Sequence, residues 1–417
     1  MTAGPPAVHA AKRRACAAVD AMAGELLAVS HRIHAHPELG YRERHAAGLL
    51  ARHLRRGRLE VEAGAYGLPT AVAGRAGATG GPHVVICCEY DAVPGLGHAC
   101  GHNIIAAAGL GAGLALAPLA GRLGGRLTVL GTPAEEGGGG KVLLGERGAF
   151  AGATAAMQVH PSSYEMVLPH VNAAATLEAT MHGRAAHASM YPERGVNALD
   201  ALVIGYLGLS TLRQHLVPTD KVHGVITAGG SAPSVVPETA AGTFMVRSAT
   251  MAELERLKGR VQACLAAGAG AAGARLTARW RWPTYLEMRH NLPLAGAFEA
   301  NLRALGRRPL APAEVPATRA ASTDMGNVSR LVPAIQPMLA VSPPDVVPHS
   351  TAFAAWAVRP PADRAVLDGA KALAMTAIDL WLRPGLAEAV RVSHPGRPAG
   401  PARPAGRPPA AAAAHGR

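Results

Sequence analysis

The most constraining feature of the sequence is a series of short apolar segments that alternate with longer helical patterns. The run HVVICCEY at 83–90 is rich in β-branched residues and lies between Gly-Pro and Pro-Gly turns, so it predicts a buried strand. A helical pattern rich in alanine and leucine follows at 103–120, and further strands are predicted at 125–131 and 153–160. Strands that alternate with helices indicate an α/β domain with a mostly parallel sheet flanked by helices.

A different pattern begins after residue 170. The segment 171–283 has the order strand, helix, strand, strand, helix, strand, which is typical of a smaller α+β, ferredoxin-like unit. Helical patterns resume near Leu292, and one more strand is predicted around the segment QPMLAVS. We therefore predict one discontinuous α/β domain, residues 16–170 and 284–390, interrupted by the α+β domain.

The two ends of the chain are expected to be disordered arms, residues 1–15 and 391–417. From His394 onward the sequence contains almost only proline, alanine, glycine and arginine, a composition that cannot bury a core.

Composition narrows the classes of function. The 417 residues are 49% hydrophobic, enough for two domains with sizeable cores. No apolar run is expected to reach the roughly 18 residues of a membrane span, and the first residues lack the apolar segment of a signal peptide. Five cysteines, odd in number and without a framework pattern, favour a cytoplasmic location. Without a long apolar run, no membrane partner is expected. The net charge of +13 comes from scattered arginines without aromatic stacking residues, so a nucleic-acid partner is not expected.

Ligand-type side chains follow each of the three predicted strands. The loop EYDAVPGLGHACGHN after the first contains Cys100 and His102, TPAEEGGGG after the second contains Glu135 and Glu136, and His160 ends the third. The carboxyl ends of parallel strands meet at one edge of a sheet, so these loops are expected to converge. Zn²⁺ accepts His, Cys and Glu ligands, and Mn²⁺ or Co²⁺ accepts much of the same set. Taken singly, each residue has an alternative role as a buried core group or a solvated loop residue.

Eight segments, in order along the chain, resemble the amidohydrolase branch of the aminoacylase/glutamate-carboxypeptidase metallopeptidase family. That branch includes auxin-conjugate hydrolases, aminobenzoyl-glutamate hydrolases and cytosolic dipeptidases. The segments are HAHPELGYRE, EYDAVPGLGHACGHN, GTPAEEGGGGKVLLGERGAF, QVHP, HGRAAHAS, GVNALDA, STDMGNVS and PHSTAF. The branch commonly has Asp at the position of Asn103, and this chain therefore differs there.

The resemblance implies a site with two divalent metal ions per subunit, Zn²⁺ or Mn²⁺, with Co²⁺ as a further alternative. The implied ligands are Cys100, His102, Glu136, His160 and His349. The resemblance also implies that Glu135 is the general base and acid, and that Asp91 supports a metal-bound neighbour.

The inserted domain is implied to be a lid and dimerisation domain, and the protein a homodimer. Its His187 resembles a histidine that stabilises the oxyanion, often in the site of a partner subunit, and its Asn197 and Arg247 resemble residues that hold the substrate carboxylate. The alternative roles are a surface histidine, a helix N-cap at Asn197 and a surface ion pair at Arg247.

The function expected from these features is metal-dependent hydrolysis of a dipeptide or an N-acyl-amino acid with a free carboxylate, by a water that Glu135 activates. The alternatives are a deacylase for N-acyl-amino acids with a hydrophobic or aromatic acyl group, and a non-catalytic binding protein on the same fold. The last would be indicated by loss of Glu135 or of a ligand, and the sequence retains them all.

Overall fold

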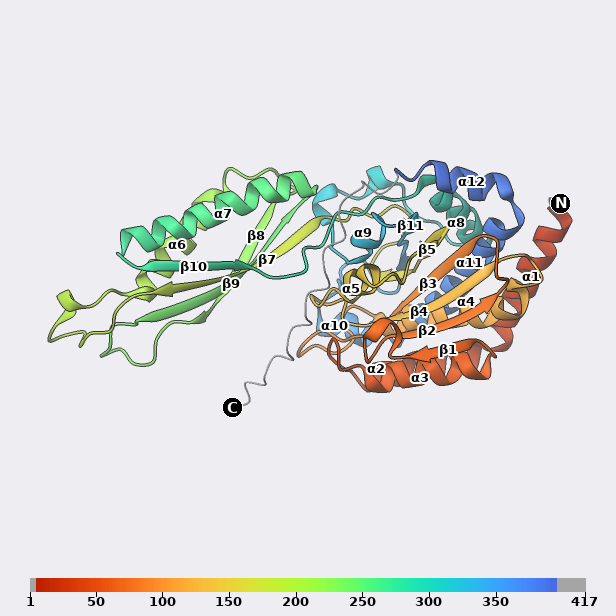
Figure 1. Ribbon diagram of the computed structural model, residues 1–417, viewed down its shortest axis with the longest axis horizontal. Coiled ribbons are helices and arrows are strands. Elements are labelled where there is room, and N and C mark those ends of the chain that lie inside the picture. Colours follow the sequence, from red (N-terminus) through yellow and green to blue (C-terminus); the bar gives the residue numbers. More distant parts are fainter. Residues whose placement is uncertain (1–4, 396–417) are drawn as a thin grey trace.

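The computed structural model describes residues 5–395, which form a larger rounded part and a narrower arm that extends from it (Figure 1). The larger part consists of segments from both sides of the arm in the sequence. Its helices are α1 (Pro5–Ala21), α2 (Ala23–Ala35), α3 (Arg44–Arg56), α4 (His102–Ala120), α5 (Gly140–Glu146), α8 (Leu292–Ala304), α9 (Met325–Val328), α10 (Thr351–Trp356), α11 (Pro360–Leu382) and α12 (Pro384–Val392). Its strands are β1 (Glu60–Ala63), β2 (Val72–Gly77), β3 (His83–Glu89), β4 (Arg126–Thr132), β5 (Ala155–Met157), β6 (His160–Ser162), β11 (Ala334–Ile335) and β12 (Met338–Ala340).

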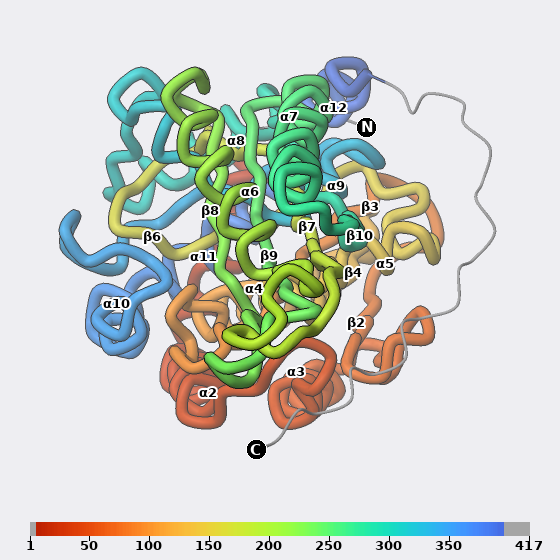
Figure 2. The backbone as a smooth tube through the Cα atoms, turned by 90° about the vertical axis from the view of Figure 1, so that its left-hand side faces the viewer, coloured from red at the N-terminus to blue at the C-terminus, as the bar shows by residue number. Residues whose placement is uncertain are grey.

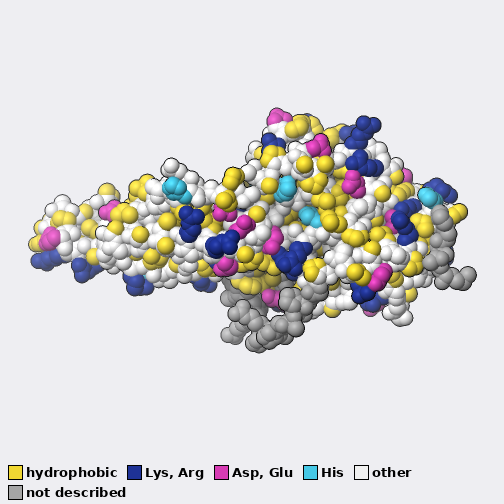
Figure 3. Space-filling model, turned by 90° about the horizontal axis from the view of Figure 1, so that it is seen from above, with side chains coloured by type: hydrophobic (Ala, Val, Ile, Leu, Met, Phe, Trp, Pro, Cys, Tyr) yellow, Lys and Arg dark blue, Asp and Glu magenta, His cyan; other side chains and the backbone are white. Residues whose placement is uncertain are grey.

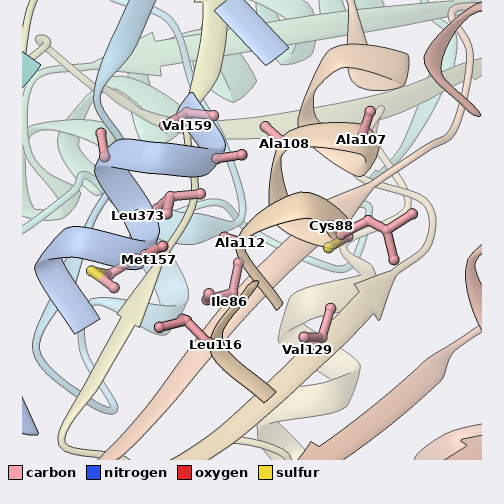
Figure 4. Packing of buried hydrophobic residues seen from close by; sticks show 14 of the residues in the cluster. Ile86, Cys88, Ala107, Ala108, Ala112, Leu116, Val129, Met157, Val159 and Leu373 are labelled. Atoms are coloured by element: carbon pink, nitrogen blue, oxygen red, sulfur yellow. The ribbon is translucent and has the colours of Figure 1, made fainter. Parts of the chain in front are cut away.

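A six-stranded sheet in the order β1-β2-β4-β3-β5-β11 forms the centre of the larger part. The strands β4, β3, β5 and β11 are parallel to one another, while β1 and β2 extend one edge in antiparallel pairing. Helices α4 and α11 cover one face, where Ile86 and Val129 of the sheet pack against Ala112 and Leu116 of α4 and Leu373 of α11 (Figure 4). The prediction of a mostly parallel α/β sheet flanked by helices is confirmed.

Helix α4 corrects one expectation drawn from composition. Over its 19 residues it is long and apolar enough to cross a membrane, with a mean hydropathy of 1.7 in its most apolar stretch, although no such run was expected. Within this structure 83% of that stretch is buried. Packing between the central sheet and α11 accounts for its apolar composition, because a helix that is apolar on all sides is typical of a domain core.

The arm is a four-stranded antiparallel sheet with two helices on one face. Its elements are β7 (Ala173–His182), α6 (Ala198–Arg213), β8 (Lys221–Ala228), β9 (Thr239–Ser248), α7 (Met251–Ala271) and β10 (Arg275–Trp280). The sheet order β10-β7-β9-β8 and the order of elements along the chain confirm the ferredoxin-like prediction. Every second residue of β7 is buried under α6 and α7, so the other face of the sheet stays open. Figure 2, viewed from the end of the arm, shows this sheet and its two helices in front of the larger part.

Both predicted disordered arms differ from the structure where it describes them. Residues 5–15 belong to α1, whose Val8, Ala15 and Val19 are buried in the main core against α4 and α11. At the other end, α12 includes Arg391 and Val392, and the tail from residue 396 lies outside the described residues. The antiparallel edge formed by β1 and β2 was not predicted either.

Candidate metal centre

The three loops predicted to converge do meet at the carboxyl ends of β3, β4 and β5. Ligand atoms of Cys100, His102 and His160 all lie within 4.8 Å of one another. The same holds for Cys100, Glu136 and His349, and for His102, Glu135 and Glu136. Because these groups share members, all five predicted ligands and Glu135 form one continuous cluster, and the cluster is buried except at the edge that carries Glu136 and His349.

Gly101 allows the first loop to lie against the third. Its φ of +74° is in the left-handed region, and an added Cβ would lie 2.6 Å from Cγ of Pro161. Only glycine therefore fits between Cys100 and His102 without displacing the loop that carries His160. The result is a distance of 3.6 Å between Sγ of Cys100 and Nε2 of His160.

Hydrogen bonds fix which nitrogen of each buried histidine is free. Nδ1 of His102 donates to Oδ1 of Asp91 at 3.0 Å, and the other carboxylate oxygen of Asp91 accepts from the backbone N of Glu136 at 2.9 Å. Nδ1 of His160 donates to the carbonyl oxygen of Pro161 at 2.8 Å. In both rings the Nε2 atom is left as the lone-pair donor, and Nε2 of His102 is buried without a hydrogen-bond partner. This is the arrangement of metal-binding imidazoles whose second nitrogen is held by an acceptor.

The adjacent acids Glu135 and Glu136 have opposite pKa shifts. Burial and the nearby charge of Glu89 raise the pKa of Glu135 well above its usual value. Burial also opposes ionisation of Glu136, but its hydrogen bond to His349 and the charge of His102 lower its pKa to about 2. One carboxyl group therefore favours a proton and the other favours a cation, as in sites where two acids perform separate tasks.

His349 reaches the cluster from a strained backbone position. Its φ of 62° lies in the left-handed region, where non-glycine residues are uncommon. Its backbone N donates to the carbonyl oxygen of Ala99 at 2.8 Å, and the hydroxyl of Ser350 caps α10 directly after it. Nε2 of His349 lies 3.4 Å from Oε1 of Glu136, although half of its side chain is exposed.

The three residues predicted in the arm lie in two different places. Arg247 is near the end of β9 that joins the larger part, and its guanidinium donates to the hydroxyl of Ser322 at 3.2 Å. The charges of Glu135 and Glu136 act on it, but burial prevails and lowers its pKa. It belongs to no ion pair among the described residues, so the alternative of a surface ion pair is wrong.

His187 and Asn197 lie in the loop that closes the opposite end of the arm. Strand β7 leaves the larger part at Ala173 and runs outward to His182, and residues 183–197 follow at the tip (Figure 1). Nδ1 of His187 accepts from the backbone N of Met190 at 3.2 Å, and the Asn197 side chain caps α6. Neither residue joins the metal cluster of its own chain among the residues described here.

Sequence reasoning missed a buried charged group behind the cluster. Nζ of Lys141 donates to Oε1 of Glu89 and, at 2.6 Å, to Oδ1 of Asp324, and all three side chains are fully buried. Tyr285 was missed as well. Its hydroxyl donates to the carbonyl oxygen of Glu135 at 2.5 Å and accepts from the backbone N of Gly139 at 3.0 Å. These bonds join the segment that follows β10 to the loop after β4, called the metal loop below because it carries Glu135 and Glu136. The sequence contained one indication of the buried charged group, because Glu89 is a charged residue within the apolar run HVVICCEY, which is predicted to be buried.

Asn103, where the family branch commonly has aspartate, uses its side-chain amide as a hydrogen-bond donor. Its amide nitrogen donates to the hydroxyl of Ser30 at 2.9 Å and to the carbonyl oxygen of Ala357 at 2.9 Å. An aspartate could not donate to that carbonyl when ionised. The amide joins α4 to α2 and to the end of α10.

Comparisons with known proteins show which family the chain belongs to. The family model for the peptidase dimerisation domain matches residues 171–272, within the predicted insertion. The Xaa-Arg dipeptidase of Mus musculus is 39% identical over 399 residues, which cover 91% of each chain. One chain of the p-aminobenzoyl-glutamate hydrolase of Escherichia coli is 30% identical over 255 residues, 56% of this chain and 53% of that one. A crystal structure titled as a dinuclear metal-binding peptidase of the M20 family from Bacillus subtilis has a TM-score of 0.65 at 19% identity, covering 86% of this chain and 98% of the other. The chain thus belongs to the amidohydrolase and dipeptidase branch of the aminoacylase/glutamate-carboxypeptidase metallopeptidase family.

Proposed function

We propose that this protein is a metal-dependent amide hydrolase that cleaves a dipeptide or an N-acyl-amino acid with a free carboxylate. The observation that carries the proposal is the cluster of five ligand-type side chains with Glu135 inside it and the unpaired Arg247 beside it. A non-catalytic binding role is disfavoured, because Glu135 and all five implied ligands are present and lie together.

The donor set fits two borderline divalent ions. It offers one thiol, three imidazoles and a carboxylate, namely Cys100, His102, His160, His349 and Glu136, and the buried Nε2 of His102 has no other partner. When bound, such ions would polarise the scissile carbonyl and make a water molecule more acidic. Metal counting on the purified protein distinguishes Zn²⁺, Mn²⁺ and Co²⁺ as the native ion.

Glu135 is the residue proposed to move the proton. Its pKa is raised by burial and by Glu89, so it accepts a proton more readily than an ordinary carboxylate. It would take the proton of the attacking water and deliver it to the leaving amine. Its backbone carbonyl is held by the hydroxyl of Tyr285, and Asp91 holds both His102 and the backbone of Glu136, so the acid and its neighbours are fixed before substrate arrives.

Arg247 is proposed to bind the substrate carboxylate. Its half-buried guanidinium contacts only the hydroxyl of Ser322 and the sulfur of Met245 among its described hydrogen bonds. A substrate carboxylate would supply the missing anionic partner with charge-assisted hydrogen bonds.

A cavity beside the metal loop would accept the remaining part of the substrate. It has a volume of about 470 Å³ between Gly137 and the open face of the arm's sheet, and its lining includes His223, Met245, Arg281 and Trp282. A cavity with methionine and tryptophan walls specifically favours the second candidate, a deacylase for a hydrophobic or aromatic acyl group. The lining holds no carboxylate, and its Arg281 is paired with Glu178 at 3.3 Å, so the cavity offers no free anionic partner for an arginine side chain of the kind named for the Xaa-Arg relatives.

A homodimer is proposed because apolar side chains are exposed on one side of the arm. Ile204 and Leu207 of α6 are 42% and 59% exposed, and Ile226 of the neighbouring edge strand β8 is 42% exposed. An exposed apolar edge strand is a template for pairing with another chain. In a dimer, His187 and Asn197 at the tip of one arm would complete the site of the other chain.

Nucleic acid is not proposed as a partner. Charged side chains are scattered, and the face shown in Figure 3 has no single basic patch of the kind that nucleic-acid binding requires.

The direct test compares the wild type with Glu135→Gln. Both proteins are purified without chelator, their metal content is counted by mass spectrometry, and each is assayed on dipeptides and N-acyl-amino acids with Zn²⁺, Mn²⁺ or Co²⁺. We expect equal metal content and a loss of roughly 10²–10⁴-fold in kcat for the variant. A wild type that binds no metal under any loading condition, or a variant as active as the wild type, would refute the proposal.

The contribution of His187 across the dimer is tested by complementation. His187→Ala and Glu135→Gln chains are each expected to be nearly inactive as homodimers. A coexpressed mixed dimer pairs an intact Glu135 in one chain with an intact His187 in the other, so one site per dimer recovers. If His187 acted in its own chain, the mixture would remain inactive.

A further inference from the structure

Glu89, the last residue of β3, has two carboxylate oxygens in different environments. Oε1 accepts hydrogen bonds from Nζ of Lys141 and, at 2.7 Å, from the amide of Gln158. Oε2 has no hydrogen-bond partner, although the side chain is fully buried. It lies 3.4 Å from Nε2 of His102, which is also buried and unpartnered.

A direct hydrogen bond does not explain this pair of atoms. Nδ1 of His102 already donates to Asp91, and neither Nε2 of His102 nor Oε2 of Glu89 makes a hydrogen bond to any described residue. The separation of 3.4 Å is also longer than the usual range for an N–H donor and an oxygen acceptor. Buried polar atoms without a partner are unfavourable, and a positive ion between these two would give both of them one.

The spacing matches two ligands of one metal ion. With bonds of about 2.0–2.2 Å and a tetrahedral angle, a histidine nitrogen and a carboxylate oxygen lie roughly 3.4 Å apart. For comparison, Nε2 of His102 lies 3.8 Å from Oε1 of Glu136, one of the ligands that the family resemblance implies, so Glu89 is closer to His102 than that implied ligand is. Glu89 also belongs to a second group of carboxylates, with Glu135 and Asp324, whose ligand oxygens lie within 4.8 Å of one another.

Lys141 explains why Oε2 of Glu89 is the free oxygen. The lysine is anchored at the start of α5, where its backbone N donates to Oδ2 of Asp324 at 2.8 Å and its Nζ contacts Oδ1 of the same residue. From this fixed position Nζ binds Oε1 of Glu89, which turns Oε2 towards His102. The ammonium also balances the negative charge of a carboxylate that would otherwise be buried without a counter-ion.

We propose that Glu89 is an additional metal ligand, which binds through Oε2 the same ion as Nε2 of His102, and that Lys141 is the residue that positions it. This inference rests on the two-metal site of the proposed function. It adds an anionic oxygen ligand to the set that the resemblance implied, and it assigns the buried Lys141–Glu89–Asp324 group to the metal site instead of to the stability of the fold alone.

The test measures metal binding independently of activity. Metal-free wild type and Glu89→Gln are titrated with Co²⁺ against a competing chelator, ions per chain are counted by mass spectrometry, and the visible absorption of bound Co²⁺ is recorded. We expect the variant to bind one of its two ions at least 10-fold more weakly and to change the Co²⁺ spectrum. Lys141→Met is expected to change the same ion's spectrum, with a smaller loss of affinity. Equal affinities and an unchanged spectrum in Glu89→Gln would overturn the proposal.

Two controls keep the result interpretable. Thermal unfolding of each metal-free variant, followed by circular dichroism, shows whether it folds. If Glu89→Gln does not fold, Glu89→Asp retains the charge but withdraws the oxygen, and it must still alter the Co²⁺ spectrum for the proposal to stand. A wild type that binds two ions and hydrolyses substrate, beside a Glu89 variant with unchanged metal binding, would refute this inference alone. A wild type that binds none would refute the proposed function itself.

Discussion

Replacing Asp91 by asparagine tests the hydrogen bonds that orient the metal loops. Both oxygens of Asp91 are used, one by Nδ1 of His102 at 3.0 Å and the other by the backbone N of Glu136 at 2.9 Å. An asparagine keeps one acceptor and places an NH₂ group against the second donor, so at least one bond to a charged acceptor is lost. Such a bond contributes about 1.5–3 kcal/mol. Since 1.4 kcal/mol corresponds to a factor of ten, the metal affinity of Asp91→Asn is expected to fall by roughly 10–100-fold.

The assay is a competition titration of the metal-free proteins with Zn²⁺ and a chromophoric chelator, together with kcat at saturating metal. Asp379→Asn is the matched control, because Asp379 is equally buried and its Oδ2 accepts from Lys12 at 2.6 Å and from Asn301 at 2.9 Å, within the packing of α1, α8 and α11. It should lower the free energy of unfolding and leave metal affinity unchanged. Wild-type affinity in Asp91→Asn, or an equal loss in both variants, would refute the reasoning.

Three further predictions concern the substrate, the dimer and pH. Arg247→Met should raise KM by roughly 10–100-fold for substrates with a free carboxylate, since a charge-assisted hydrogen bond is lost. Substrates with an amidated carboxyl group should be cleaved equally by the variant and the wild type. An equal rise in KM for both kinds of substrate would contradict the role of Arg247. Leu207→Asp should dissociate the dimer in sedimentation velocity, while Val392→Asp, at an apolar position that is 66% exposed on α12, should not. Burial, with the charges of Arg126 and Arg75, lowers the pKa of His83 from 6.5 to about 4. Between pH 6.5 and 4 the histidine is therefore protonated in the unfolded chain but not in the folded one, so the free energy of unfolding should fall as the pH drops through this range. His83→Gln should remove up to about 2 kcal/mol of that loss at pH 5 in urea unfolding, and an unchanged pH dependence would contradict it.

The elements that could be predicted from the sequence are those whose patterns are local. Strand β3 and helix α4 follow from a continuous apolar run and a long alanine-rich segment, and the structure confirms both nearly to the residue. The cluster of ligands could be anticipated because each loop directly follows a strand, and parallel strands bring such loops together. Helix α1 has few large apolar residues, and it packs on α11, some 350 residues later in the chain.

Lys141 shows why part of the site could not be predicted. In the sequence it follows four glycines at the start of a short helix, which is the usual place of a solvated lysine. Its burial depends on Glu89 and Asp324, which lie 52 and 183 residues away in the chain. The same holds for Tyr285, whose hydroxyl reaches Glu135 across 150 residues. Partners set by the tertiary fold leave no pattern in the neighbouring sequence.

The arm carries Arg247 at its base and His187 at its tip, and the length of β7 and β9 separates them. If the tip of one arm completes the active site of the partner subunit, dilution that dissociates the dimer also removes its active sites. At protein concentrations below the dissociation constant of the dimer, the rate should therefore vary with the square of the protein concentration. A chain with an inactive catalytic part would still supply a functional tip to a normal partner, so mixtures of normal and defective chains should retain more activity than the fraction of fully normal dimers alone.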